Sequence, residues 1–315
     1  GPLKSLRNHQ KEALDAVVDG LSKADRGQMI MACGTGKTFT ALRIAEDKSL
    51  VPGGGSVLVL VPSLALVGQT LREWAAQTER GFHAFTVCSD QQVSKDNDDI
   101  TTRDLAYPAT TDPGVLAERI AAVKATEPNK PTVVFSTYQS VQAVCDAQSR
   151  HDLDRFDLVI CDEAHRTAGV SLSGQGVTQE SEFTKPLSER FLAARKRVFM
   201  TATPRVYGVQ SHSKADEAGA TLYSMDDPTF FGEVLYQLNF GEAVDRGLLA
   251  DYRVLIVAVD SGALGEVANS YNSTYRLDDK TGISAEFATR LIGTWKGLTK
   301  QDAVTLDDAG NEIPL

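Results

Sequence analysis

Two short motifs, each attached to an apolar run, constrain this chain more than any other feature. Residues 31–38 read Met-Ala-Cys-Gly-Thr-Gly-Lys-Thr and overlap the end of the apolar run 28–32. Residues 162–165 read Asp-Glu-Ala-His and follow the apolar run 157–161. A buried strand that ends in a Gly-rich turn and opens a helix is the setting of a phosphate-binding loop. The pair of motifs therefore predicts a site for a nucleoside triphosphate.

The residue types in the Gly-rich loop suit this chemistry. Glycines let backbone N–H groups approach phosphate oxygens, and the N-terminus of the following helix favours negative charge. Lys37 is expected to reach the outer phosphates and the Thr38 hydroxyl to bind magnesium. The strict loop pattern has Gly where this chain has Met31, so the form here resembles the loop of helicase-type ATPases. The predicted nucleotide-binding residues of the loop are Cys33, Gly34, Thr35, Gly36, Lys37 and Thr38.

The acidic motif predicts the catalytic half of the same site. In a parallel sheet the carboxyl ends of the strands face the ligand crevice. Asp162 is expected to hold magnesium, directly or through water, and Glu163 to orient and deprotonate the attacking water. We therefore expect Lys37, Asp162 and Glu163 to be catalytic, with Thr38 and Asp162 as metal ligands. Two solvated acids capping a helix would explain the acids but not their pairing with the phosphate loop.

Alternating apolar runs and helical patterns predict an α/β fold, with a mostly parallel sheet flanked by helices on both faces. This architecture resembles that of RecA-like phosphate-loop domains. The candidate strands are residues 28–32, 56–62, 84–89, 132–137, 157–162, 196–202 and 253–259. The candidate helices are residues 8–24, 37–48, 63–79, 112–126, 138–149 and 183–194.

Polar stretches suggest where the domain is interrupted and where it ends. Residues 90–111 and 168–181 are expected to be loops, the latter rich in Gly, Ser and Thr. The chain turns polar from 260 to 281. We therefore predict a first domain over 1–258, followed by a segment over 259–315 that leads toward a second domain.

Charge and cysteine content limit the function classes. The net charge of -10 disfavours a protein that coats nucleic acid nonspecifically, but it leaves room for one narrow groove. The four cysteines, at 33, 88, 145 and 161, have no C-x-x-C spacing, so we expect reduced thiols of a cytoplasmic protein. No apolar run approaches membrane-spanning length and no signal peptide is visible, so we expect no membrane partner.

The order of motifs over residues 4–258 resembles the first RecA-like domain of a superfamily-two helicase or translocase of the Asp-Glu-Ala-His kind. Residues 6–10, Leu-Arg-Asn-His-Gln, are similar to the adenine-sensing element of that family. A glutamine amide pairs donor-to-acceptor with adenine N6 and N7. The resemblance thus implies base contacts by Gln10 and Arg7, whereas a solvated helix start is the alternative.

Three further segments resemble motifs of the same family. Residues 61–66 and 135–140 are similar to its strand-tracking motifs, which implies nucleic-acid contacts by Ser63, Thr137 and Gln139. Ordinary helix capping by Ser or Thr is the alternative. Residues 200–205, Met-Thr-Ala-Thr-Pro-Arg, are similar to the motif that links nucleotide state to strand binding. The implied coupling residues are His165, Thr201 and Thr203.

A narrower resemblance appears toward the end of the chain. Residues 240–244 and 247–252 resemble motor subunits of type I and type III restriction enzymes, and residues 291–298 resemble type ISP restriction enzymes. The implied cofactors are ATP and Mg2+, and the implied partner is double-stranded DNA. That family also uses a second RecA-like domain, a nuclease and a methyltransferase, none of which is visible in this sequence.

The expected function is an ATP-dependent DNA translocase or helicase motor of a bacterial restriction or phage-defence enzyme. A strand-separating DNA or RNA helicase outside restriction systems is one alternative. A nucleotide-switched nucleic-acid binding module is another, although Lys37, Asp162 and Glu163 are all present for hydrolysis. In the family the second domain supplies an arginine to the nucleotide, so weak hydrolysis is expected of this chain alone.

Overall fold

The computed structural model describes residues 3–88, 109–172, 182–208, 211, 213 and 220–250, together with four short strands beyond residue 274. The chain forms two compact units, Gly1–Ala250 and Asp251–Leu315. Every motif of the predicted site lies in the first unit. The predicted strand 253–259 and the segment 291–298 lie outside the described residues.

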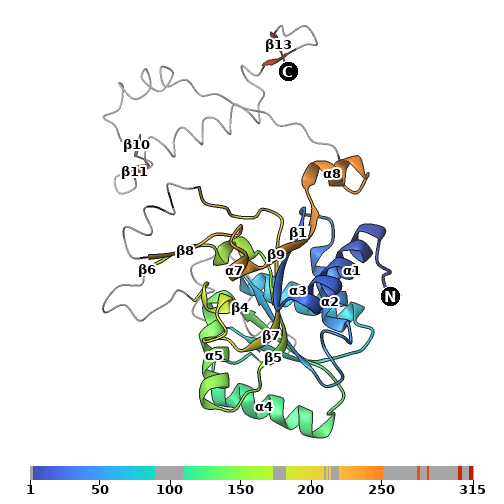
Figure 1. Cartoon of the computed structure of the whole chain (residues 1–315), viewed down its shortest axis with the longest axis vertical. Coiled ribbons are helices and arrows are strands. Elements are labelled where there is room, and N and C mark those ends of the chain that lie inside the picture. Colours follow the sequence, from blue (N-terminus) through green and yellow to red (C-terminus); the bar gives the residue numbers. More distant parts are fainter. Residues whose placement is uncertain are drawn as a thin grey trace. The chain divides into compact units, whose positions relative to one another are not determined.

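A seven-stranded sheet organises the first unit, in the order β3-β4-β2-β5-β7-β1-β9 (Figure 1). All neighbouring strands in it run parallel. This confirms the predicted α/β class with a mostly parallel sheet. The strands are β1 (Arg26–Met31), β2 (Ser56–Val61), β3 (His83–Val87), β4 (Thr132–Thr137), β5 (Phe156–Cys161), β7 (Ala194–Thr201) and β9 (Glu233–Leu238).

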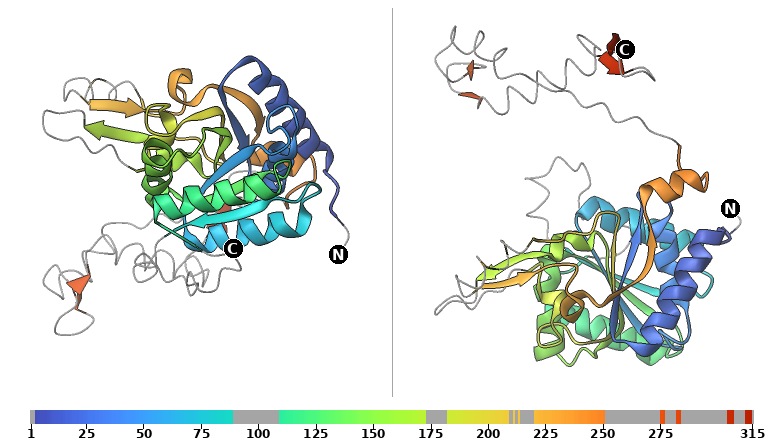
Figure 2. Two further views of the ribbon diagram at one scale, coloured as in Figure 1. Left: turned by 90° about the horizontal axis from the view of Figure 1, so that it is seen from below. Right: turned by 45° about the horizontal axis from the view of Figure 1, so that its top comes forward.

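Helices cover both faces of the sheet, as predicted. Val57 and Val59 of β2 pack in a core cluster with residues of α1, α2 and α3, whereas Leu58 and Leu60 pack in a second cluster with residues of α4 and α5. Burial on both faces explains why the strands read as continuous apolar runs. Figures 1 and 2 show α1 and α5 on opposite sides of the sheet. The helices are α1 (Asn8–Lys23), α2 (Lys37–Glu46), α3 (Leu64–Gln77), α4 (Pro113–Thr126), α5 (Val141–Arg150), α7 (Pro228–Phe231) and α8 (Phe240–Asp245).

The predicted helix over 183–194 is wrong, because only a 3-10 turn forms there, at Lys185–Leu187. Pro186 has no backbone N–H and its ring disfavours a continuous α-helix. The freed carbonyls are bound from the sheet instead: the Arg197 guanidinium on β7 donates hydrogen bonds to the carbonyls of Pro186 and Leu192. A side chain on the following strand, and not the local helical pattern, therefore holds the conformation of this segment.

Two further segments differ from the sequence expectation. The helix predicted over 138–149 begins with a 3-10 turn, Tyr138–Ser140, before α5 starts at Val141. Within the predicted loop 168–181, residues Gly169–Leu172 form strand β6, which pairs antiparallel with β8 (Ala220–Tyr223). Figure 2 shows this two-stranded ribbon extending away from the main sheet. A four-residue strand that finds its partner about fifty positions later along the chain has too short a local pattern to predict.

The edge strand β9 was also missed. It pairs with β1, and its residues are mostly exposed or half-buried, so it lacks the continuous apolar pattern of the central strands.

Among the described helices, none combines the length and the apolar character needed to cross a lipid bilayer.

Candidate nucleotide site

The strand order brings three predicted motifs to adjacent strand ends. β7 lies between β1 and β5, so the Gly-rich loop, the segment after Thr201 and the acidic pair all follow neighbouring strands. The backbone N–H of Asp162 donates to Leu60 O at 2.8 Å, which continues the β5–β2 pairing beyond the end of β5. In parallel sheets this edge is where ligands bind.

The Gly-rich loop has the backbone that its sequence requires. Gly34 and Gly36 have φ angles of 82° and 88°, in the left-handed region that favours glycine. A Cβ atom at Gly36 would also lie 2.3 Å from Gln10 Nε2, so no other residue fits there without rearrangement. Lys37 opens α2, and its ammonium donates to Met31 O at 3.2 Å.

The first turn of α1 holds this loop. Gln10 Oε1 accepts the backbone N–H of Arg7 at 2.9 Å, and Gln10 Nε2 donates to Thr35 O and Gly36 O at 3.4 Å. His9 Nε2 hydrogen-bonds to Thr35 O at 2.8 Å. Both ends of the Gln10 amide thus have partners within the protein, and its contact with adenine stays a prediction. His9 was missed by the sequence analysis, where its only signal was the position beside Gln10.

An open groove of about 490 Å³ lies next to this turn. Glu12 and Arg246 form an ion pair at 2.8 Å across it, and Arg246 also pairs with Glu242 at 2.6 Å. The hydrogen bonds from Arg246 hold the pKa of Glu12 below its usual range. The residue Arg246 lies between two segments that the sequence analysis singled out, but nothing local indicated its approach to α1. The groove is lined by Arg7, Asn8, His9, Glu12, Arg246 and Leu248.

Asp162 has an electrostatic environment that suits a metal ligand. Burial and the nearby charge of Glu163 raise the pKa of Asp162 to about 6, while the Glu163 N–H and the Lys37 ammonium lower it. The charges of Lys37 and Asp162 therefore interact across the strand ends. A buried carboxylate beside a second acid is stabilised by an added cation, because opposite charge favours its ionised form.

Glu163 sits in a strained backbone conformation. Its φ and ψ angles of 48° and 47° lie in the left-handed region, which is uncommon for a residue with a Cβ atom. Such strain persists only where surrounding interactions hold it, and it is concentrated at functional sites. Here the Glu163 N–H donates to Asp162 Oδ1 at 3.0 Å. The Glu163 side chain stays 27% exposed, so its carboxylate is accessible to a water molecule.

His165 joins Glu163 to the end of β7. Its Nδ1 lies 3.3 Å from Glu163 Oε2 and 3.0 Å from Thr201 Oγ1. Thr201 Oγ1 in turn accepts the Thr203 N–H at 3.1 Å. Burial is the largest cause that lowers the pKa of His165; the Glu163 carboxylate opposes it, and nearby cations including Lys37 act with it. The structure therefore places His165, Thr201 and the Thr203 backbone in consecutive contact, with Glu163 3.3 Å from the same His165 nitrogen.

Tyr138, which follows β4, contacts the backbone of the acidic pair. Its hydroxyl donates to Asp162 O at 2.7 Å, and its ring stacks on Phe183 with centroids 5.6 Å apart. Complete burial raises the pKa of Tyr138 well above its ordinary value, so the phenol stays protonated and donates. Tyr138 lies within the motif 135–140, but nothing in the local sequence indicates this role.

The predicted nucleic-acid residues lie at the neighbouring strand ends, after β2 and β4. Ser63 accepts the Leu66 N–H at 3.4 Å and caps α3. Thr137 is 2% exposed, and its hydroxyl donates to Ser140 Oγ at 3.1 Å. Gln139 Oε1 is buried and has no hydrogen-bond partner in the described part of the chain. Two of these three side chains are thus used within their own turns.

The residues present fit a magnesium ion that arrives with a nucleotide. Among the described residues, no group of three or more His, Cys, Asp or Glu side chains could hold a metal by itself. Magnesium in nucleotide sites takes one or two protein groups, and phosphate oxygens and water complete its shell. Thr38, in the first turn of α2, and Asp162, at the end of β5, are groups of that kind.

The fold and site together define a class. A parallel sheet with a phosphate loop after β1, Asp-Glu-Ala-His after β5 and Thr-Ala-Thr at the end of β7 is the first RecA-like domain of a superfamily-two helicase. The family model described as "Type III restriction enzyme, res subunit" matches residues 3–206. This chain belongs to that family.

Two curated proteins with similar sequences are a probable helicase and a restriction enzyme subunit. A probable helicase of African swine fever virus is 30% identical over 255 residues, which cover 80% of this chain and 24% of the viral protein. The type I restriction enzyme EcoAI endonuclease subunit of Escherichia coli is 26% identical over 82% of this chain and 25% of its own length. The chain thus spans about a quarter of these curated relatives.

Two solved structures share the fold. The ATP-dependent type ISP restriction-modification enzyme LlaBIII, bound to DNA, matches with a TM-score of 0.71 and 35% identity, over 96% of this chain and 19% of that enzyme. A nuclease-deletion mutant of the type ISP enzyme LlaGI, in complex with a DNA substrate mimic, matches with a TM-score of 0.64 and 36% identity, over 85% of this chain and 19% of that one.

Proposed function

We propose that this chain is the ATP-hydrolysing half of a motor that moves along double-stranded DNA in a restriction or phage-defence enzyme. One observation carries the proposal. The Gly-rich loop that carries Lys37 follows β1, Asp162 follows β5 on the other side of β7, and the strained, half-exposed Glu163 comes next in the chain. A cation and a pair of half-buried acids at one edge of the sheet are what hydrolysis of a magnesium-bound triphosphate needs.

Each residue has a defined part in the proposed reaction. The loop amides and Lys37 bind the β- and γ-phosphates, and Thr38 and Asp162 hold magnesium, which neutralises charge that develops on the phosphates. Glu163 orients a water molecule and accepts its proton as the water attacks the γ-phosphorus, while the bond from the γ-phosphorus to the bridging oxygen breaks and ADP leaves. The Glu163–His165–Thr201 contacts offer a route by which the loss of the γ-phosphate reaches the end of β7.

The groove beside Arg7 is the proposed site of the nucleobase. It adjoins the turn that holds the phosphate loop, and it is large enough for a planar ring. Arg7 and Gln10 are the groups we expect to contact adenine. To do so, the Gln10 amide would exchange one of its hydrogen bonds to Arg7, Thr35 or Gly36 for a hydrogen bond to the base.

The proposed partners follow from the domain's place in larger enzymes. Double-stranded DNA would be the track, and a second RecA-like domain would close over the nucleotide and supply an arginine. Such an arginine contributes about 10³–10⁵ in rate. We therefore propose that this chain alone binds Mg-ATP weakly and hydrolyses it slowly. A nuclease and a methyltransferase would act with the motor in the complete polypeptide, in the cytoplasm.

The test uses the complete polypeptide that carries this domain. Glu163→Gln should lower DNA-stimulated phosphate release by about 10²–10⁴-fold while Mg-ATP binding is retained, because the amide keeps the shape and loses the base. Glu118→Gln, on the exposed face of α4, is the matched control and should leave the rate unchanged. Persistent hydrolysis by the Glu163 variant would contradict the assigned base.

A second measurement separates translocation from strand separation. A translocase should displace a triplex-forming strand from an intact duplex when ATP is present. A strand-separating helicase should instead unwind a forked duplex. Unwinding without triplex displacement would replace the translocase proposal with the helicase alternative, and nucleotide-dependent DNA binding without either would favour the switch module.

A further inference from the structure

A buried tryptophan connects the phosphate-loop helix to the helix beside it. Trp74, on α3, is fully buried, and its indole Nε1 donates to Thr38 O at 3.0 Å. Thr38 is the second residue of α2, whose N-terminal turn follows the Gly-rich loop. The only polar group of the Trp74 side chain is therefore spent on the residue whose hydroxyl we assign to magnesium.

The position of this hydrogen bond allows it to fix the first turn of α2. In the first turn of a helix the carbonyl accepts one N–H from four residues later, and its second lone pair remains available. When the indole occupies that lone pair, the Thr38 peptide is fixed from outside the helix. The backbone at Thr38 sets the direction of its Cα–Cβ bond, and the hydroxyl then takes one of the few χ1 rotamers that the helix allows.

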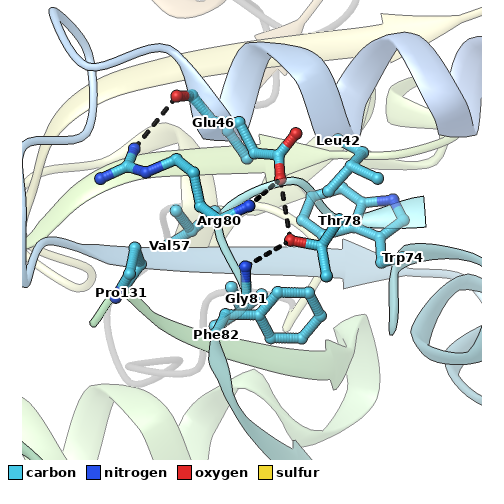
Figure 3. A pocket seen from close by; sticks show the side chains of 11 residues that line it. Leu42, Glu46, Val57, Trp74, Thr78, Arg80, Gly81, Phe82 and Pro131 are labelled. Carbon is cyan, nitrogen blue, oxygen red and sulfur yellow. Dashed lines mark hydrogen bonds between the residues drawn. The ribbon is translucent and has the colours of Figure 1, made fainter. Parts of the chain in front are cut away.

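The indole is itself held in place. Its ring meets Phe135 of β4 edge to face, with centroids 5.5 Å apart and an interplanar angle of 77°. Phe82, just before β3, meets it in the same manner at 6.4 Å. The cavity beside the ring is about 10 Å³, which is room for about one water molecule. Figure 3 shows Trp74 and Phe82 around this small space, which is too small for a ligand.

A second link joins the last residue of α2 to the residues just after α3, one turn beyond Trp74. Glu46, the last residue of α2, accepts hydrogen bonds through Oε1 from Thr78 Oγ1 at 2.8 Å and from the Arg80 N–H at 3.2 Å. The Arg80 guanidinium donates back to Glu46 O at 3.0 Å (Figure 3). Glu46 is eight residues after Thr38, or about 12 Å along the helix. The two links therefore belong to one interface, but only the Trp74 link touches the nucleotide end.

We propose that Trp74 is a positioning residue, which sets the Thr38 hydroxyl for magnesium by fixing the first turn of α2 against α3. The proposal rests on the proposed function, because Thr38 is a magnesium ligand only in a nucleotide-binding site. It also implies that α3, which starts at the predicted nucleic-acid residue Ser63, and the magnesium turn shift together.

The test measures magnesium dependence in the 315-residue chain. Trp74→Phe keeps an aromatic ring and removes the N–H. In titrations with a fluorescent N-methylanthraniloyl ATP, the magnesium concentration at half-saturation should rise about 2- to 10-fold, the range expected for one lost hydrogen bond. The affinity for the metal-free nucleotide should not change, because it does not pass through the Thr38 hydroxyl.

Thr78→Ala is the matched control, because it weakens the Glu46 link of the same interface. It should lower the melting temperature, as Trp74→Phe does, and leave the magnesium half-saturation at the wild-type value. Equal magnesium curves for wild type and Trp74→Phe would overturn the proposal. A shift of the same size in Thr78→Ala would reduce it to general loosening of the interface, and so overturn it as well.

A second measurement does not depend on the folding of Trp74→Phe. The chain has two tryptophans, so Trp295→Phe leaves Trp74 as the single emitter. Its emission should change when magnesium is added to the nucleotide-bound protein, and not when metal-free nucleotide is added; an unchanged emission would contradict the proposal. Wild-type protein that binds no nucleotide, or binds it without magnesium dependence, would instead contradict the proposed function itself.

Discussion

The carboxyl edge of the sheet has two halves that are built differently. In the nucleotide half, after β1, β7 and β5, side chains leave their own turns and meet those of other strands, as His165 meets Thr201. In the half proposed to meet nucleic acid, after β2 and β4, the hydroxyls of Ser63 and Thr137 bond within their own turns. The first half is therefore a side-chain site, whereas the second presents helix starts and backbone N–H groups.

This difference suits the two proposed ligands. A triphosphate with its metal is small and needs charges at fixed points, so distant side chains must converge and accept strain, as at Glu163. A nucleic-acid backbone offers repeating phosphates, and backbone N–H groups at helix N-termini bind them without reading sequence. We infer that Ser63 and Thr137 act chiefly by shaping the turns that meet DNA.

The largest expected effect is the loss of nucleotide binding at the nucleotide half of the sheet edge. Lys37→Ala should weaken Mg-ATP binding by at least about 100-fold, because charge-assisted hydrogen bonds to the outer phosphates are lost. Equilibrium titration with a fluorescent ATP analogue measures this. Lys48→Ala, a lysine exposed just past the same helix, is the control and should bind as wild type does. Near-normal binding by the Lys37 variant would remove that residue from the site.

An intermediate effect is expected from a charge placed at the nucleic-acid half. Ser63→Asp keeps a side chain that caps α3, so thermal stability should be retained. The added negative charge at the helix start should repel a DNA phosphate and lower DNA affinity of the complete polypeptide by about tenfold, more at low salt than at high salt. Fluorescence anisotropy with labelled duplex measures the DNA affinity and its dependence on salt.

Ser63→Ala is the complement of that variant. It should lower the free energy of unfolding by about 1 kcal/mol through loss of the cap, and change DNA affinity less than Ser63→Asp does. Equal losses of DNA affinity in the two variants would show that the hydroxyl itself binds DNA, and the proposed contrast between the halves would fail.

The smallest effect concerns the groove beside α1. Arg246→Ala removes the ion pair with Glu12 and should lower the preference for ATP over GTP about 2- to 5-fold, with metal-dependent phosphate contacts intact. Competition titrations with the two nucleotides measure the ratio. Arg150→Ala, another exposed arginine, at the end of α5, serves as the control. An unchanged ratio would place the base elsewhere.

Local sequence was enough to predict the strand, Gly-rich turn and helix around Lys37, and the strand that ends at the acidic pair. Glycine at 34 and 36, lysine at 37 and two acids after an apolar run act through backbone geometry and charge over a few residues, so their pattern is readable without a fold. The parallel sheet also followed from alternating patterns, since burial on both faces demands continuous apolar strands. The resemblance to helicase motors followed from the order of these local motifs.

Only the tertiary structure decided which residues far apart in the sequence come into contact. It placed β7 between the two motif strands, added the half-exposed edge strand β9, and replaced the predicted helix 183–194 with a turn bound by Arg197. It also brought Trp74 to Thr38 and Tyr138 to Asp162. These contacts join residues 24 to 36 positions apart, beyond the reach of helical or strand periodicity. They form because crossover connections and close packing, not local propensity, determine which strand ends become neighbours.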